Sequence, residues 1–341
     1  MTVTHLSRLA GDYGPQTAQD LNQQFPLTTK ALQVRPVPPG GSDAAAWPIP
    51  YDRVRLTTFV SAYLETLRGE EILYYPTPGN GGDCVIQVGV YQALHRAGVT
   101  FRPINLEADV AGRTVMFGGG ANLTPLYREL RDALLEKKFL ERCGRLIILP
   151  HTIRGNEDLL ELMDSRTTIF CRDPESYIHV QRHARTSEVH LDHDMALHID
   201  IDQFYRDPAR YTDAPGLFES LVRKAGHVFD ADDRQTERAF FRTDGEASGL
   251  VVKPTANLDI SRTFELGTWP ENAHKAVWCF FEAIRRSSHV HTDRLHVGIA
   301  ASLLDKPCTF HDNSYGKNRT VYLHSIRKYV RPESLEFIGS R

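Results

Sequence analysis

Short apolar runs alternate with segments of helical spacing from about residue 55 onward. The runs are four to seven residues long and rich in β-branched and aromatic residues, which is typical of buried strands. In the first half the predicted strands are Glu70–Pro76, Thr114–Gly120, Arg145–Pro150, Thr167–Arg172 and Met195–Asp200. Predicted helices cover Arg55–Leu67, Cys84–Ala97 and the stretch from Gly120 through Leu140. This alternation predicts a parallel sheet with helices on both faces.

The pattern resumes after a polar stretch, Ile201–Asp233, that contains two prolines. We predict an N-terminal arm or linker over residues 1–50, an α/β lobe over 51–205, an inter-lobe segment over 206–233 and a C-terminal lobe over 234–341. The elements expected in the last lobe are a strand at Arg238–Thr243, a helix at Glu271–Ser287, the strand HVHT, a helix at Val297–Leu304 and the strand PCTFHD. The fold class is therefore α/β, with two Rossmann-like lobes and a central cleft.

Composition narrows the class of protein further. Apolar residues make up 41% and charged residues 24% of the 341, a balance typical of globular proteins. The net charge of −3 gives no broad electrostatic footprint for nucleic acid. No apolar run reaches the roughly 18–20 residues of a membrane span, and the N-terminus lacks the layout of a signal peptide. The five cysteines form no C-x-x-C pair, which favours free thiols and a cytoplasmic location.

Two glycine-rich turns follow predicted strands. In TPGNGGDCVIQVG, residues 77–89, the turn opens a helix, where backbone N–H groups favour an anion. The alternative is a tight turn in which Asp83 caps the helix. The second turn, FGGGANLTP, holds Gly118, Gly119 and Gly120, which suits either a ligand or close packing between lobes.

Charged residues also follow strands or begin helices. Arg172 comes directly after a strand, and the carboxyl ends of parallel strands are where α/β sheets bind ligands. Arg294 and His296 stand at the start of the apolar helix Val297–Leu304, which suggests that a ligand or another part of the molecule needs them there. The alternative is a helix-capping arginine and a hydrogen-bonded histidine.

The run HLDHDMALHIDID, residues 190–202, offers several ligands that metals accept. His198, Asp200 and Asp202 alternate with isoleucines, however, so we interpret the run as a half-buried strand leading into a polar linker. No metal site is expected there.

Together these motifs resemble the polysaccharide pyruvyl transferase family, in order from about Ile72 to Lys317. The matching elements are N-x-G-D (Asn80, Gly82, Asp83), the triple glycine, LPHTI (Leu149–Ile153), R-D-x-x-S (Arg172, Asp173, Ser176), Asp194, DRLHVGIAA (Asp293–Ala301) with Lys306–Pro307, and a shortened Y-x-x-K ending at Lys317. The first 70 residues lie outside the resemblance.

The resemblance implies a GT-B-like arrangement of the two lobes, with phosphoenolpyruvate as donor in the cleft and no metal or other cofactor. The residues it implies are Arg172, Arg294, Leu295 and His296 for the donor, His296 and Asp83 for catalysis, Asn80 and His151 for the acceptor, and Gly119, Gly120 and Lys317 as further site residues. The implied acceptor is a saccharide or a lipid-linked oligosaccharide, with peripheral membrane association left open and no nucleic acid.

This assignment suits the chemistry of phosphoenolpyruvate. Its carboxylate and phosphate are groups that arginines bind with paired hydrogen bonds. Formation of a ketal requires a proton donor, and a histidine can exchange a proton near neutral pH. We therefore expect a ketal pyruvyltransferase of exopolysaccharide or cell-surface polysaccharide synthesis. The rivals are a nucleotide-sugar glycosyltransferase on the same scaffold and a non-catalytic binding protein for phosphosugars or polysaccharides.

Overall fold

Two parallel sheets form the framework of the chain. The computed structural model describes residues 58–136, 139–229, 236–247, 249, 253–327 and 334–339. Internal contacts divide the chain between Thr58 and Phe59, and residues 59–341 form one compact unit. The predicted arm, residues 1–50, lies outside the described residues, and the predicted lobe boundaries stay a prediction.

The first sheet has seven strands in the order β2-β1-β3-β5-β6-β7, with β4 also paired to β5, and all of its pairs are parallel. Its elements are α3 (Phe59–Thr66), β1 (Glu71–Tyr75), α4 (Gly81–Ala97), β2 (Thr100–Pro103), β3 (Thr114–Phe117), β4 (Gly120–Leu123), α5 (Glu129–Glu136), α6 (Phe139–Arg142), β5 (Arg145–Ile153), α7 (Glu157–Leu162), β6 (Thr167–Cys171), α8 (Pro174–His183) and β7 (Glu188–Leu191). The α/β class and the parallel sheet are thus confirmed.

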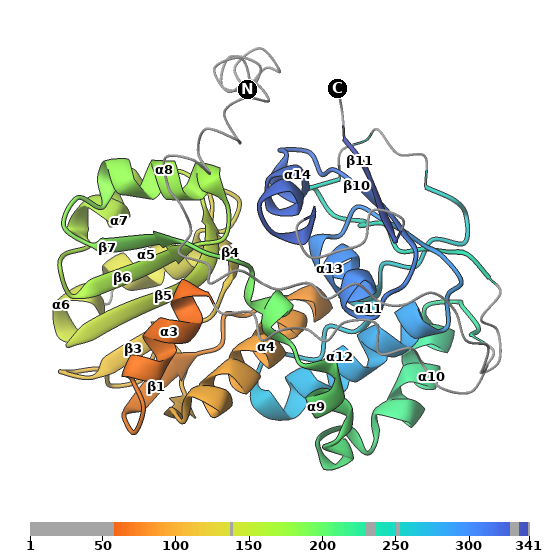
Figure 1. Ribbon diagram of the computed structural model, residues 1–341, viewed down its shortest axis with the longest axis horizontal. Helices are drawn as coiled ribbons and strands as arrows, with labels where there is room; N and C mark the ends of the chain where they lie inside the picture. Colours follow the sequence, from red (N-terminus) through yellow and green to blue (C-terminus); the bar gives the residue numbers. More distant parts are fainter. Residues whose placement is uncertain are drawn as a thin grey trace, which may run out of the picture. The chain divides into compact units, whose positions relative to one another are not determined.

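The second sheet has four parallel strands in the order β11-β10-β9-β8. The elements from residue 195 onward are η1 (Met195–His198), α9 (Ile201–Tyr205), η2 (Pro208–Tyr211), α10 (Ala214–Lys224), β8 (Arg238–Ala239), α11 (Ile260–Thr263), α12 (Pro270–Arg285), β9 (Val290–Thr292), α13 (Leu295–Leu303), β10 (Cys308–His311), α14 (Lys317–Val321), the π-helical turn η3 (Tyr322–Ile326) and β11 (Leu335–Ile338). Figure 1 shows the first sheet on the left and the second at the upper right.

The strand predicted at Met195–Asp200 is wrong. Residues 195–198 form a 3₁₀ turn, and the last strand of the first sheet lies earlier, at Glu188–Leu191. Asp194 accepts a hydrogen bond from the N–H of Ala196 at 2.8 Å, and Asp200 accepts one from Gln203 at 2.7 Å. These aspartates therefore begin helical turns, as capping residues do, and the alternation of His198, Asp200 and Asp202 does not mark a strand.

Alternate residues of the strands enter two hydrophobic cores, as the pleat of a strand requires. Leu73, Ile148 and Ile169 belong to a core on one side of the first sheet, whereas Ile72 and Phe170 belong to the other. That second core continues through α4 into the helices of the second sheet.

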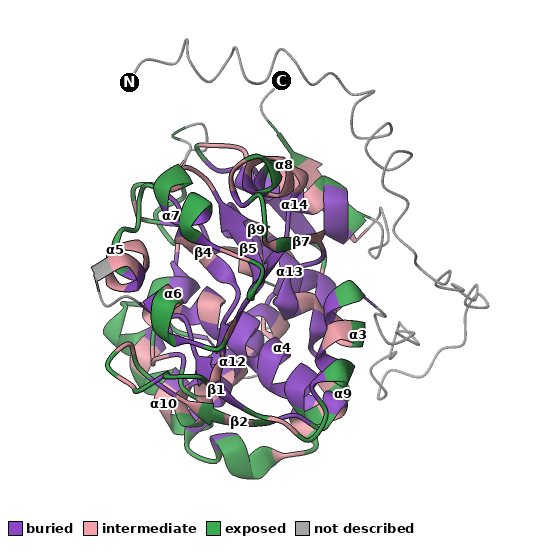
Figure 2. Cartoon of the chain, turned by 90° about the vertical axis from the view of Figure 1, so that its left-hand side faces the viewer, coloured by how far each residue is buried: buried purple, intermediate pink, exposed green. Residues whose placement is uncertain are grey.

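Helix α4 is the central element of this continuous core. Fourteen of its 17 residues are buried, and it packs against α3, α11, α12, α13 and η1. Figure 2 shows α4 and α12 as buried, with exposed residues gathered on peripheral helices such as α9 and α10. Among the described residues, no helix is both long and apolar enough to cross a bilayer. All five cysteines are free, as predicted, and all five are also buried.

Candidate active site

The turn before α4 is held by a reciprocal pair of hydrogen bonds. The Gly82 N–H donates to the side chain of Asn80 at 2.8 Å, and the Asn80 N–H donates to Asp83 Oδ2 at 2.8 Å. Such a capping box contributes about 1 kcal/mol to a helix start. The turn also approaches the second sheet, because a Cβ at Gly82 would lie 2.9 Å from Nδ1 of His296. Asn80 and Asp83 therefore serve as capping residues at a point that His296 reaches.

The triple glycine after β3 has two structural roles. A Cβ at Gly118 would lie 2.8 Å from the hydroxyl of Tyr74, and one at Gly119 would lie 2.8 Å from the Pro150 carbonyl oxygen. These two glycines permit close packing. Gly120 has a φ of 147°, and a Cβ there would stand 3.7 Å from the His151 ring and 3.9 Å from Asp83 Oδ1. The nearest atom to such a Cβ is Asn122 Oδ1 at 3.0 Å, so Gly120 permits the close approach of Asn122 beside His151 and Asp83.

His151 is a fully buried histidine near the end of β5. The backbone N–H of Asn122 donates to its Nε2 at 3.2 Å, so Nε2 carries the lone pair. Burial and the neighbouring Arg172 lower the pKa of His151 to about 3. His151 therefore stays neutral at physiological pH. It can accept a hydrogen bond, but it is not suited to act as a general acid.

Arg172, Asp194 and His296 form a buried group that joins the two halves of the unit. Arg172, 1% exposed, follows β6 and donates from Nη1 to Asp194 Oδ2 at 2.7 Å and from Nε to Thr152 at 2.9 Å. Asp194 Oδ2 also lies 3.4 Å from Nε2 of His296 on α13. Burial by itself would raise the pKa of Asp194, but Arg172 and His296 outweigh it and hold that pKa below its usual range. The Asp194 carboxylate therefore stays ionised beside the Arg172 guanidinium.

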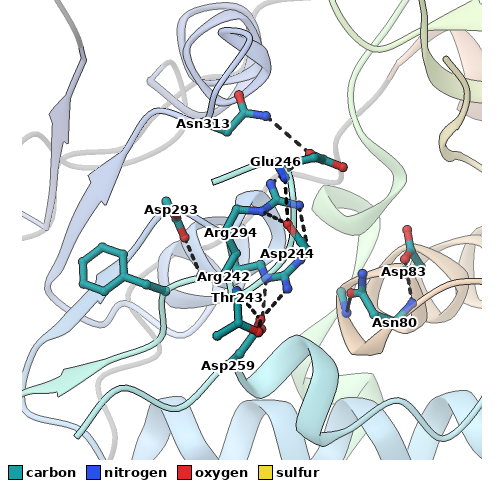
Figure 3. Close-up of polar contacts among 12 residues, drawn as sticks. Asn80, Asp83, Arg242, Thr243, Asp244, Glu246, Asp259, Asp293, Arg294 and Asn313 are labelled. Carbon is teal, nitrogen blue, oxygen red and sulfur yellow. Dashed lines mark hydrogen bonds and ion pairs between the residues drawn. The ribbon is translucent and has the colours of Figure 1, made fainter. Parts of the chain in front are cut away.

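Arg294 caps the start of α13 and is enclosed by carboxylates (Figure 3). Its Nε and Nη2 donate to Asp259 at 3.0 and 2.5 Å, and its Nη1 pairs with Asp244 at 2.8 Å. All three guanidinium nitrogens are occupied, and no contact with Arg172 is found among the described residues. Leu295, the next residue, has its side chain in the hydrophobic core. The two predicted donor arginines thus lie in separate ion-pair groups.

The carboxylate of Glu246 binds a second set of donor side chains, close to Arg294 and Asp244. Lys317 lies 2.7 Å from its Oε2 and Arg242 Nη1 lies 2.9 Å from the same oxygen. The hydroxyl of Tyr127, which follows β4 of the first sheet, donates to Oε1 at 2.9 Å. Burial, Arg242 and Arg172 lower the pKa of Lys317 to about 8, although Glu246 acts to raise it. Lys317 is thus a titratable group close to neutral pH.

The carboxyl ends of parallel strands explain why these side chains gather. β5, β6 and β7 lead to His151, Arg172 and Asp194, as expected at the ligand-binding edge of an α/β sheet. β8 and β9 lead in the same way to Arg242 and Arg294. We call Arg172, Arg242, Arg294, His296 and Lys317 the basic cluster.

Four members of this region were missed by reasoning from sequence: Arg242, Asp244, Glu246 and Asp259. Asp244 and Glu246 follow the strand predicted at Arg238–Thr243 and could have been indicated by the same rule that selected Arg172. Arg242 lay inside that predicted strand, whereas the observed strand β8 ends at Ala239. Asp259 had no comparable signal. Its role depends on a chain reversal that brings it beside Arg294.

Comparison with known proteins identifies the class to which this site belongs. The model of the family described as polysaccharide pyruvyl transferase matches residues 80–315. The chain belongs to that family, which confirms the resemblance, and membership of the family indicates a transferase.

Two individual proteins are similar over most of their length. EpsO of Bacillus subtilis (strain 168), whose name assigns it provisionally to the pyruvyl transferases, is 26% identical over 307 residues, covering 81% of this chain and 91% of its own. An uncharacterized protein of Klebsiella pneumoniae with a crystal structure is 27% identical, with a TM-score of 0.64, and the match covers 82% of this chain and 96% of that one.

Proposed function

We propose that this protein transfers the pyruvyl group of phosphoenolpyruvate to two hydroxyls of a sugar in an exopolysaccharide or cell-surface polysaccharide precursor. The product is a cyclic pyruvate ketal, and phosphate is released. The observation that carries the proposal is the buried group of Arg172, Asp194 and His296, in which a guanidinium and an imidazole share one carboxylate at the ligand-binding edge of the sheet. Membership of the family supports the same reaction class.

The reaction needs one proton to be delivered and two to be removed. A proton adds to the methylene carbon of phosphoenolpyruvate, and C2 gains cationic character. One sugar hydroxyl forms a bond to C2 and loses its proton. The C2–O bond to phosphate then breaks, and the second hydroxyl closes the ring with loss of its own proton. Of the two protons released, one balances the proton consumed and the other leaves with phosphate.

His296 is our candidate for the proton donor. Its Nε2 lies 3.4 Å from Oδ2 of Asp194, close to Arg172 at the carboxyl ends of the strands. His151 is neutral and its Nε2 already accepts from Asn122, so it would donate to an acceptor hydroxyl through Nδ1, with Asn80 as a second contact. Asp83, whose Oδ1 lies beside Gly120, is our candidate for the group that accepts a hydroxyl proton. Lys317, with its lowered pKa, is a further candidate for proton transfer.

Donor binding requires a change in the ion pairs. The arginines and the lysine of the basic cluster are each paired with a carboxylate, so an added anion must replace one of them. The Asp259 side chain is 5% exposed, whereas that of Asp244 is 32% exposed. We propose that Asp244 withdraws when the donor enters and that Arg294 then binds the donor through Nη1, while Asp259 keeps its ion pair with Nε and Nη2 of Arg294.

The proposal has three further parts, which concern the arrangement of the two sheets, the acceptor and the need for a cofactor. We propose that the two sheets belong to two Rossmann-like lobes in a GT-B-like arrangement, with Arg172 and Arg294 on opposite sides of the donor. The acceptor is a saccharide or a lipid-linked oligosaccharide in the cytoplasm, and the transfer itself needs neither a metal nor an organic cofactor.

The test is acceptor-dependent release of phosphate from phosphoenolpyruvate, measured in a single turnover with a panel of galactosides, glucosides and mannosides. Thermal unfolding with the same ligands gives a second measurement, because a ligand of the folded state raises the transition temperature. We expect phosphoenolpyruvate to raise it and UDP- or GDP-sugars not to do so. The opposite pattern would favour a glycosyltransferase, and binding without release of phosphate would favour a binding protein.

A further inference from the structure

Two neighbouring helices outside the basic cluster each carry a pair of metal-ligating side chains one turn apart. His179 and His183 are four residues apart on α8, and Glu157 and Glu161 are four apart on α7, so each pair lies on one helix face. The helices pack together. His179 Nε2 lies 3.9 Å from Glu157 Oε1, and His183 Nδ1 lies 3.6 Å from Glu161 Oε1.

The geometry is close to that of a metal site. One ligand atom each from Glu157, His179 and His183 lies within 4.8 Å of the other two. Zinc binds histidine nitrogen and carboxylate oxygen at about 2.0–2.2 Å, so tetrahedral ligands stand about 3.3–3.6 Å apart. The side chains of Glu157 and Glu161 are more than half exposed. They can therefore rotate to close the remaining gap without disturbing the core.

A hydrogen bond already orients one of the histidines. His179 Nε2 lies 2.8 Å from the carbonyl oxygen of Gly155. Because a carbonyl only accepts, Nε2 carries the hydrogen and Nδ1 carries the lone pair. The nitrogen that His179 offers to a metal is therefore Nδ1, and the 3.9 Å between Nε2 and Glu157 shows only that the two side chains are neighbours. Metal-binding histidines are commonly fixed in this way by their other ring nitrogen. The histidine ligands also select the metal, since calcium and magnesium prefer sets made of oxygen alone.

We propose that Glu157, His179 and His183 bind one Zn²⁺ ion, with Glu161 as the fourth ligand. The ion would cross-link α7 to α8, the helix that begins directly after Arg172 and Asp173. Its role would be to hold these helices together, with no part in pyruvyl transfer. The proposal does not depend on the proposed function.

The experiment uses the full chain without a polyhistidine tag, stripped with EDTA and dialysed. Zinc binding is measured by competition with a chromophoric chelator, and thermal unfolding is followed with and without ZnCl₂. We expect one zinc per chain and a higher transition temperature. His179→Ala and His183→Ala should each weaken binding by about tenfold or more, since even partners outside the ligand set are worth about 10–100-fold. His95→Ala, at an exposed helical position on α4, is the matched control and should bind zinc as the unmodified protein does.

His179→Ala also removes the bond to Gly155 and could disturb folding. His183→Gln avoids this problem, because no hydrogen bond from His183 to the backbone is found among the described residues, and unfolding in EDTA shows whether either variant is intact. Cobalt supplies a geometric check, since four-coordinate Co²⁺ absorbs strongly in the visible range. The absence of bound zinc, or zinc binding that folded His183→Gln and His183→Ala leave unchanged, would overturn the proposal.

Discussion

Replacing Asp244 by asparagine tests whether the donor competes with a carboxylate of the protein. Asp244 accepts from Nε of Arg242 at 2.7 Å and pairs with Nη1 of Arg294 at 2.8 Å. Asparagine keeps the shape of the side chain but removes its charge. If the donor must displace Asp244, its binding should become tighter in Asp244→Asn, because less interaction is lost on displacement.

The size of the effect follows from the exposure of the side chain. Hydrogen bonds to charged groups contribute about 1.5–3 kcal/mol, and a side chain that is 32% exposed belongs at or below the lower end of that range because water screens it. We therefore expect about 1.4 kcal/mol, which corresponds to a dissociation constant for phosphoenolpyruvate about tenfold lower.

The assay is calorimetric titration of phosphoenolpyruvate without acceptor, at fixed ionic strength. Glu282→Gln is the matched control, since Glu282 pairs with Arg286 on α12 and its loss should leave donor affinity unchanged. An unchanged or weaker affinity in a folded Asp244→Asn variant would refute the reasoning. Asp244 would then position Arg294 for the donor rather than compete with it.

Four further predictions concern the donor, the proton donor, the buried histidine and metal dependence. Arg294→Lys keeps the charge but loses the planar group, so phosphoenolpyruvate should bind about 10–150-fold more weakly; unchanged binding by calorimetry would remove Arg294 from the donor site. His296→Gln should lower kcat by about 10²–10⁴-fold with a smaller change in KM, and normal turnover would show that His296 is not the acid. Because the pKa of His151 is about 3 in the folded protein and about 6.5 unfolded, the unfolded state binds more protons below pH 6.5, and stability falls as the pH decreases towards 3. The measurement is the free energy of unfolding, obtained by urea titration at several pH values between 6.5 and 4.5. His151→Gln should reduce the slope of this free energy against pH by up to about 1.4 kcal/mol per pH unit, whereas His95→Gln should not change it. Turnover should survive EDTA, and its loss with recovery on adding Mg²⁺ or Mn²⁺ would contradict a metal-free transfer.

The strands β1, β3, β5 and β6 could be predicted because the apolar runs of parallel strands are nearly continuous. The strands β2, β4, β7 and β11 were not predicted, and β4 lies where a helix from Gly120 through Leu140 was expected. The helix expected at Glu271–Ser287 is found at Pro270–Arg285, with the proline at its first position. The strand expected at Met195–Asp200 failed for a local reason: Asp194 and Asp200 satisfy backbone N–H groups and so begin helical turns. Alternating polarity does not reveal such caps.

The candidate site could be predicted only where one side chain stands at the end of a strand or at the start of a helix. Arg172 was selected because it follows a strand and His296 because it stands at a helix start, and both lie beside Asp194. The partners of Arg294 could not be found, because Asp259 is 35 positions away and contacts it only after the chain folds back. The link from Tyr127 to Glu246 spans 119 positions for the same reason.

The buried contacts of helix α4 restrict the movements that the protein can make. Enzymes with two separate domains often admit substrate by rotation about a hinge, and such a rotation here would expose the apolar residues through which α4 contacts α12 and α13. At about 25 cal/mol for each Å² exposed, opening a few hundred Å² would cost several kcal/mol. Entry of substrate is therefore expected to involve movement of surface turns over a rigid frame, and the residues 59–341 should unfold in a single cooperative step.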